Sequence, residues 1–165
     1  MHKHFDEIAV SARVWIYQAD KRLSDENTLK LQMTADQFTK QWAAHGKALA
    51  SAAKIFYNQF LVLAVDETHH NASGCSIDSS VAFVKQAEVE FGINFFDRTK
   101  VAFILNDDIY VESLQNIKHK IAEGIIKRDT ITFNNLVTTK GEMLENWKSE
   151  AGSTWLSKYF VAEQL

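Results

Sequence analysis

Proline is missing from all 165 residues, whereas it makes up about 5% of an average protein. The chain therefore has no proline-rich linker that could separate two domains, and it lacks proline as a turn marker. A chain of this length buries enough surface to fold as one unit without disulfides or metals. We expect a single domain over residues 1–165, in which residues 1–12 form a frayed leader or a short helix.

Cysteine occurs once, as Cys75, so no disulfide can form within the chain. Long hydrophobic runs are also missing. The longest, residues 60–65, is far shorter than the ~20 residues that span a bilayer, and it suits a buried strand. Residues 1–7 are mostly polar, and no apolar segment typical of a signal peptide follows them. We therefore expect no membrane span and a cytoplasmic protein.

A long run of basic residues is absent, and the formal net charge is −3 with histidine neutral. Lysine and arginine are scattered along the chain, so nothing in the sequence predicts a surface that neutralises a phosphate backbone, and we expect no nucleic-acid partner. The composition excludes disorder of the whole chain, because the sequence contains 11 Phe, 4 Trp and 4 Tyr and has a hydrophobic fraction of 46%.

Segments typical of strands and of helices follow one another along the chain. Strands are expected at 13–18, 54–65, 100–105, 109–111 and 130–133. Helices are expected from Ser24 to Gly46, at 78–91, after Ser113, after Thr139 and at 155–160. Residues 106–108 indicate a hairpin, which requires antiparallel pairing. We expect an α/β fold, with α+β as the alternative, built from a single mixed β-sheet with helices packed on it.

The segment 66–78 is the part of the sequence richest in chemically active side chains, and it joins an expected central strand to the start of a helix. In open α/β sheets ligands bind at the carboxyl ends of strands, and a helix start adds free N–H groups. The candidate catalytic residues are Cys75, His70 and His69, and the candidate ligand-binding residues are Ser73, Gly74, Ser76, Asp78, Glu67 and Arg98.

Cys75 has two alternative interpretations. It could be a nucleophile or redox thiol, activated by the helix start and by His69 or His70 acting as base. Three carboxylates in the same segment oppose this, because nearby negative charge favours the neutral thiol. The alternative, which we prefer, is a small hydrophobic residue buried beneath the loop.

The hydroxyl groups of the segment also have alternatives. The serines and Gly74 could bind a small anion, or they could serve only as turn and capping groups, with Asp78 or Ser76 as the N-cap of the helix. A divalent metal is not expected, because the adjacent His69 and His70 lack the spacing of zinc signatures. We expect no cofactor.

Two residues outside the segment carry structural interpretations. His45 is expected in the last turn of the first long helix, where a helix C-terminus favours positive charge. Arg98 is adjacent to Asp97, which favours an ion pair or a loop anchor over a clamp on a substrate.

Five segments carry a resemblance to a known family: 42–46 (WAAHG), 66–67 (DE), 73–81 (SGCSIDSSV), 96–98 (FDR) and 133–137 (FNNLV). On these residues the chain resembles a family of short bacterial proteins of about this length, found mainly in Bacteroidetes and often labelled ABC transporter ATPase. The resemblance covers nearly the whole chain, and 73–81 is its most specific part. It implies no established activity and no catalytic residues.

The ATPase label can be tested against the residues that nucleotide hydrolysis requires. The phosphate-binding loop follows the pattern G-x-x-x-x-G-K-[ST], in which backbone N–H groups hold the phosphates. Gly46 and Lys47 are adjacent, but Ala48 follows them and Gln41 stands where the first glycine is needed. We therefore expect no ATPase activity.

Two functional hypotheses remain. The first, which we prefer because no spacing is specific for a reaction class, is a small-ligand or protein binding module, with a homo-oligomer left open. The second is a small enzyme or redox protein that uses Cys75 with a nearby histidine. The sequence identifies neither the ligand nor the partner.

Overall fold

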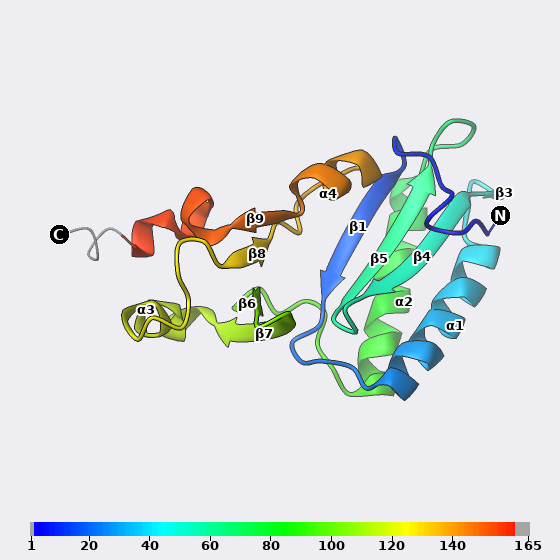
Figure 1. Ribbon diagram of the computed structural model, residues 1–165. Helices are drawn as coiled ribbons and strands as arrows, with labels where there is room; N and C mark the ends of the chain where they lie inside the picture. The colour runs from blue at the N-terminus through cyan, green and yellow to red at the C-terminus, as the bar shows by residue number, and fades with distance from the viewer. Residues whose placement is uncertain (1, 161–165) are drawn as a thin grey trace.

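The computed structural model describes residues 2–160. Its first sheet contains β1 (Arg13–Gln18), β5 (Phe60–Asp66) and β4 (Ala50–Phe56), in the order β1-β5-β4 and with antiparallel pairing throughout. The central strand β5 is buried from Phe60 to Val65, as its uninterrupted apolar sequence predicts. β1 is the edge strand nearest to the second half of the molecule (Figure 1).

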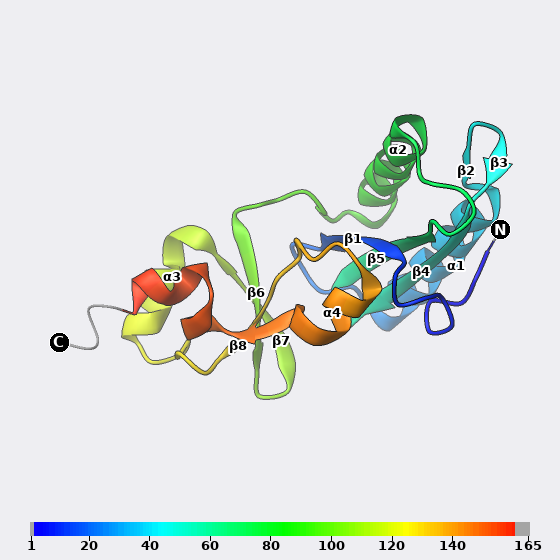
Figure 2. The same cartoon turned by 90° about the horizontal axis from the view of Figure 1, so that it is seen from above.

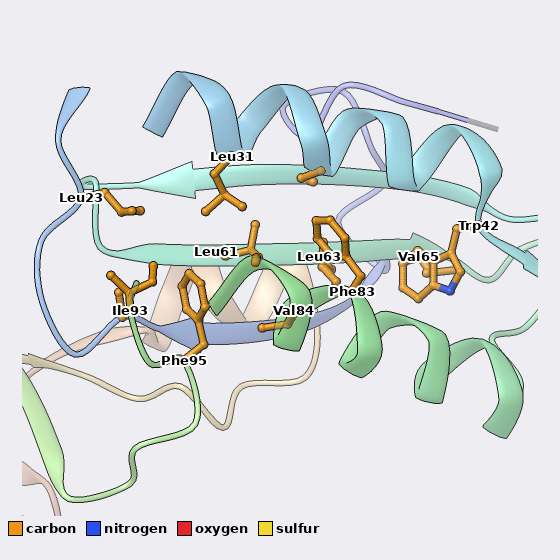
Figure 3. Packing of buried hydrophobic residues seen from close by; sticks show 14 of the residues in the cluster. Leu23, Leu31, Trp42, Leu61, Leu63, Val65, Phe83, Val84, Ile93 and Phe95 are labelled. Atoms are coloured by element: carbon orange, nitrogen blue, oxygen red, sulfur yellow. The ribbon is translucent and has the colours of Figure 1, made fainter. Parts of the chain in front are cut away.

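Two helices cover one face of this sheet (Figure 2). α1 (Asp25–Gln41) begins after Ser24, the expected N-cap, whose hydroxyl accepts a hydrogen bond from the Asn27 N–H over 3.0 Å. α2 (Gly74–Phe91) ends at Gly92, which adopts the left-handed conformation that glycine permits. Figure 3 shows the apolar core between the helices and the sheet, which includes Leu31, Phe83, Val84, Leu61, Leu63 and Val65.

A small hairpin, and not a continuation of the helix, connects α1 to β4. β2 (Ala43–Ala44) pairs with β3 (Lys47–Ala48), and His45 and Gly46 form the turn with φ angles of 52° and 77°. Two positive φ angles in succession are typical of a tight two-residue hairpin turn. The expectation that the helix extends to Gly46, with His45 in its last turn, is therefore wrong.

The second sheet has four antiparallel strands in the order β7-β6-β8-β9. They are β6 (Lys100–Leu105), β7 (Asp108–Ser113), β8 (Ile131–Phe133) and β9 (Lys148–Glu150). The predicted hairpin between β6 and β7 is confirmed, and it turns at Asn106 and Asp107. Three helical segments build a separate core on this sheet: α3 (Leu114–Ala122), η1 (Ala151–Ser153) and η2 (Trp155–Tyr159).

The two sheets are joined by a third apolar cluster on the face of the first sheet that α1 and α2 leave free. The N-terminal segment and α4 (Lys140–Asn146) contribute to it. Its buried members include Phe5, Ile8, Val14, Phe60, Val62, Ala102, Val137, Met143 and Trp147. The molecule therefore has two lobes whose contact surface is itself part of the core.

The N-terminal segment is fixed by one buried lysine. The Nζ atom of Lys140 donates hydrogen bonds to the main-chain carbonyls of Phe5, Asp6 and Ile8 over 2.8, 3.1 and 2.9 Å. An ammonium group has three donors, so these carbonyls satisfy it completely. Residues 2–12, the described part of the expected leader, are not frayed, because Phe5, Ile8 and Ala12 pack into the third apolar cluster.

The predicted fold class is confirmed in its α+β form, but the sheet is not single. The expected long strand at 54–65 is two strands, β4 and β5, that turn at Tyr57 and Asn58, both with positive φ. Thr139 caps α4 as predicted, with its hydroxyl accepting from the Glu142 N–H over 3.1 Å. None of the helices within residues 2–160 is long and apolar enough to cross a membrane.

Candidate functional site

The carboxylates at the start of segment 66–78 hold the loop in shape. Asp66 Oδ1 accepts from the N–H and the hydroxyl of Thr68 over 3.0 and 2.5 Å, and these hydrogen bonds lower the pKa of Asp66. Glu67 Oε2 accepts from the Ala72 N–H over 2.8 Å. Both carboxylates therefore have a structural role in the loop, which competes with binding a metal or contacting the thiol.

The serines of the segment form the cap of α2. Ser73 is the N-cap, and its hydroxyl accepts from the Ser76 N–H over 3.1 Å, while Ser76 Oγ accepts from the Ser73 N–H over 2.7 Å. The expectation that Asp78 or Ser76 is the N-cap is therefore wrong, although Ser76 completes the capping box. Gly74 opens the helix, and the Asp78 side chain lies exposed on it.

Cys75 is exposed in the first turn of α2. The preferred interpretation of a buried structural thiol is therefore wrong. Within residues 2–160, however, no hydrogen bond joins its sulfur to His69 or His70, so the proposed thiol–imidazole pair is not assembled. The same described part of the chain contains no group of three or more His, Cys, Asp or Glu side chains that could hold a metal ion.

The loop forms one wall of a shallow polar hollow of about 470 Å³. The β2–β3 hairpin forms the other wall, so His45 and Lys47 come close to His69 and His70. The structure thus brings the two candidate histidines, His69 and His70, together with His45, which was expected at a helix end. His45, Lys47, His69 and His70 are all exposed.

A larger cleft of about 560 Å³ lies where the two sheets meet, and we call it the inter-sheet cleft. Its walls come from β1, from the connection after α2, from β6, and from the residues after β8. The residues that matter below are Ile16, Tyr17, Gln18, Phe96, Arg98, Asn135, Leu136 and Trp155. A smaller neighbouring hollow shares Asn135, Leu136 and Trp155 with it.

A chain of side-chain hydrogen bonds crosses the inter-sheet cleft. The indole N–H of buried Trp147 donates to Asn135 Oδ1 over 2.9 Å, and Asn135 Nδ2 donates to Gln18 Oε1 over 3.0 Å. Gln18 Nε2 in turn donates to the carbonyl of Lys100 over 3.1 Å. These bonds connect β1 to β6 and to the residues after β8.

Large apolar side chains surround the mouth of the inter-sheet cleft. Leu136, Trp155 and Phe96 are 86%, 52% and 40% exposed. Tyr17 packs edge-on against Phe96 with ring centres 5.6 Å apart, and burial raises the pKa of Tyr17 although a hydrogen bond with Ser80 opposes the shift. Exposed apolar side chains gathered on a concave surface are typical of a binding site.

Two basic residues line the cleft, Arg98 and Lys100, and the Nζ of Lys100 donates to the Ser113 hydroxyl over 3.0 Å. The expected ion pair with Asp97 does not form, because Asp97 Oδ1 accepts from the N–H and the hydroxyl of Thr99 over 2.9 and 2.5 Å, which lowers the pKa of Asp97. Arg98 is exposed, and within residues 2–160 its guanidinium has no ion-pair or hydrogen-bond partner. Of the candidate ligand-binding residues, it is the one that lies in the inter-sheet cleft.

Sequence reasoning missed most of this cleft. Gln18, Asn135 and Trp155 come from three distant parts of the chain, and no local spacing connects them. Comparison of the chain with protein families, with curated proteins and with solved structures found no match in any of the three.

Proposed function

We propose that the protein is a binding module, without ATPase activity of its own, that holds its ligand in the inter-sheet cleft. The observation that supports this most strongly is the grouping of exposed Phe96, Leu136 and Trp155 around one concave surface. Ligand sites are typically clefts of about 300–1,000 Å³ that combine apolar walls with a few fixed polar groups. The hydrogen-bonded amides of Gln18 and Asn135 are such groups.

The chemistry of the walls favours a ligand with an apolar or aromatic part and an anionic part. An aromatic ring of the ligand that packs edge-on or offset against Phe96 or Trp155 gains about 0.5–1.5 kcal/mol beyond the area it buries. Arg98, whose guanidinium has no partner within residues 2–160, suits a carboxylate, which it can bind with two parallel hydrogen bonds. The segment 66–78 is a weaker candidate, because the described residues that line its hollow include no large apolar side chain.

The experiment is a calorimetric screen of aromatic carboxylates, such as indole-3-acetate and phenylpropionate, against the full chain. We expect at least one saturable binder whose affinity falls about tenfold or more in Trp155→Ala, which is the size expected for an anchoring aromatic residue. Leu29→Ala is the matched control, because Leu29 is exposed on α1, away from the cleft. Equal binding to Trp155→Ala and the native chain would place the ligand elsewhere.

The second candidate function, a small enzyme or redox protein that uses Cys75, keeps one supporting observation. The thiol is exposed at the start of a helix of 18 residues, where a reagent can reach it. In the described part of the chain neither His69 nor His70 forms a hydrogen bond with it, so no base is positioned there. Loss of an activity in Cys75→Ser and in His70→Ala, but not in Trp155→Ala, would favour this candidate over the binding module.

A further inference from the structure

The outer edge of β1 is paired over only part of its length. The Val14 N–H donates to the carbonyl of Thr138 over 2.9 Å, and the Lys140 N–H donates to the carbonyl of Ala12 over 2.9 Å. These bonds form an antiparallel bridge between Arg13 and Thr139 on the side of β1 away from β5. The backbone groups of Ala12 and Val14 therefore point out of the first sheet.

The same orientation recurs at every second residue of an extended strand. Arg13, Trp15 and Tyr17 face β5, whereas Ile16 and Gln18 present their N–H and C=O groups to the outer edge, as Val14 does. The chain that pairs with Val14 turns away before it reaches Ile16, at an Asn134 side chain that accepts from the Leu136 N–H. Within residues 2–160 the N–H and C=O of Ile16 meet no partner.

This unpaired edge is a wall of the inter-sheet cleft, since Ile16 and Gln18 both line it. We propose that the occupant of the cleft is an extended peptide that adds to β1 as a further strand at Ile16 and Gln18. The inference rests on the proposed function and names its ligand. Main-chain hydrogen bonds to an exposed strand edge provide affinity in this mode of recognition, and side-chain pockets provide specificity.

The side chains around the edge define the peptide's chemistry. Successive residues of a strand lie about 3.3 Å apart and point to opposite faces, so a bound peptide places every second side chain against the apolar mouth at Phe96, Leu136 and Trp155. The free guanidinium of Arg98 complements a carboxylate. The fitting segment is therefore short, carries large apolar or aromatic residues at alternate positions, and contains an acidic residue or ends in a carboxylate.

A second copy of the chain is a poorer occupant for this edge. The unpaired groups of β1 lie within a cleft that has walls from both lobes, so the same edge of another copy is equally recessed. A free extended segment can enter the cleft, whereas two recessed edges cannot reach each other. Dimerisation through β1, detected by sedimentation and blocked by the peptide, is the outcome that would replace this proposal.

The test begins with a phage-displayed library of random dodecapeptides panned on the full chain, followed by synthesis of the enriched peptide. Amide hydrogen exchange is then measured with and without that peptide. We expect the amides of Ile16 and Gln18 to exchange rapidly in the free protein and at least about tenfold more slowly in the complex. The amides of Trp15 and Tyr17, which face β5, are internal controls that stay protected in both states.

Two substitutions complete the test without touching the core. Trp155→Ala and Arg98→Glu should each weaken the peptide about tenfold or more, whereas His70→Ala, in the polar hollow, should leave it unchanged. Failure to enrich any peptide, or protection of amides away from β1, overturns the peptide proposal. If aromatic carboxylates still bind at Trp155 in that case, the proposed function stands; if they do not, both fail.

Discussion

The side-chain amide of Asn135 donates to Gln18 Oε1 over 3.0 Å and accepts from the indole N–H of Trp147 over 2.9 Å. One side chain thus connects β1 of the first sheet to the buried ring at the end of α4. Asn135→Ala leaves the indole donor of Trp147, which is only 4% exposed, without its partner. An unsatisfied buried donor costs about 1–3 kcal/mol, so we expect the free energy of unfolding to fall by that amount.

Urea unfolding measures this loss, with Asn71→Ala as control because Asn71 is exposed in the polar hollow. The control should change stability by less than about 0.5 kcal/mol. Equal stability of Asn135→Ala and Asn71→Ala would mean that the hydrogen-bond chain does not hold the cleft together.

Lys140→Met tests the fixing of the N-terminal segment. The substitution keeps an apolar stem of similar length but leaves the carbonyls of Phe5, Asp6 and Ile8 without the ammonium that now binds them. We expect a loss of at least about 2 kcal/mol, together with faster proteolysis within residues 2–12. In the matched control Lys148→Met, an exposed lysine whose Nζ donates to the Tyr57 hydroxyl is replaced, so stability should change little. A similar effect of both substitutions would contradict the structural role of Lys140.

The hydrogen bond from Tyr110 to Glu112 predicts a pH dependence of stability. Burial raises the pKa of Glu112, but hydrogen bonds from the Tyr110 hydroxyl, the Ser113 N–H and Asn116 outweigh it, and the net shift is downward from 4.5. The ionised form is thus favoured by folding. Its contribution to stability is complete above pH 4.5 and is lost as the pH falls through the lowered value.

Glu112→Gln should therefore flatten the stability profile below about pH 4.5, whereas the exposed control Glu90→Gln should not. On the alkaline side, burial and the neighbouring Glu112 raise the pKa of Tyr110 to about 12. Spectrophotometric titration should accordingly show Tyr110 ionising at a lower pH in Glu112→Gln than in the native chain. Identical acid profiles for the native chain and Glu112→Gln are the contrary result.

Cys75 should react with a thiol reagent in the folded protein, because its side chain is exposed. Labelling with Ellman's reagent under native conditions should proceed to one thiol per chain, at a rate within about tenfold of that in denaturant. His69→Ala and His70→Ala should leave the rate unchanged, since no hydrogen bond joins either imidazole to the sulfur within residues 2–160. Labelling that requires denaturation would mean that the thiol is covered in solution.

The ends of helices were predicted correctly where a single residue caps the helix. Ser24 as an N-cap, Gly92 as a helix end and Thr139 as a cap each act within a few residues of themselves. The β4–β5 turn was missed, although the β6–β7 turn at Asn106 and Asp107, which also lacks glycine and proline, was predicted. Tyr57 and Asn58 carry the β4–β5 turn in left-handed conformations, and without proline or glycine there the segment is typical of one long strand.

Long-range contacts explain the other errors. Lys140 was indistinguishable from a surface lysine, because the carbonyls that bind it are more than 130 residues away in the chain. The inter-sheet cleft was missed for the same reason, since Gln18 and Asn135 are 117 residues apart in the chain. Segment 66–78 was correctly recognised as a loop before a helix, but its polar residues proved to bond to one another.

The most direct test of the central claim is the behaviour of the indole N–H signals of the four tryptophans in a two-dimensional ¹⁵N–¹H NMR titration. The native chain is titrated with the best binder from the aromatic carboxylates. A ligand in the inter-sheet cleft should shift the signal of Trp155 saturably, and to a smaller extent that of Trp147, whose indole bonds Asn135. The signal of Trp42, whose indole N–H donates to the carbonyl of Ser76 within segment 66–78, should stay in place. Saturable movement of the Trp42 signal with Trp155 unchanged would contradict the account.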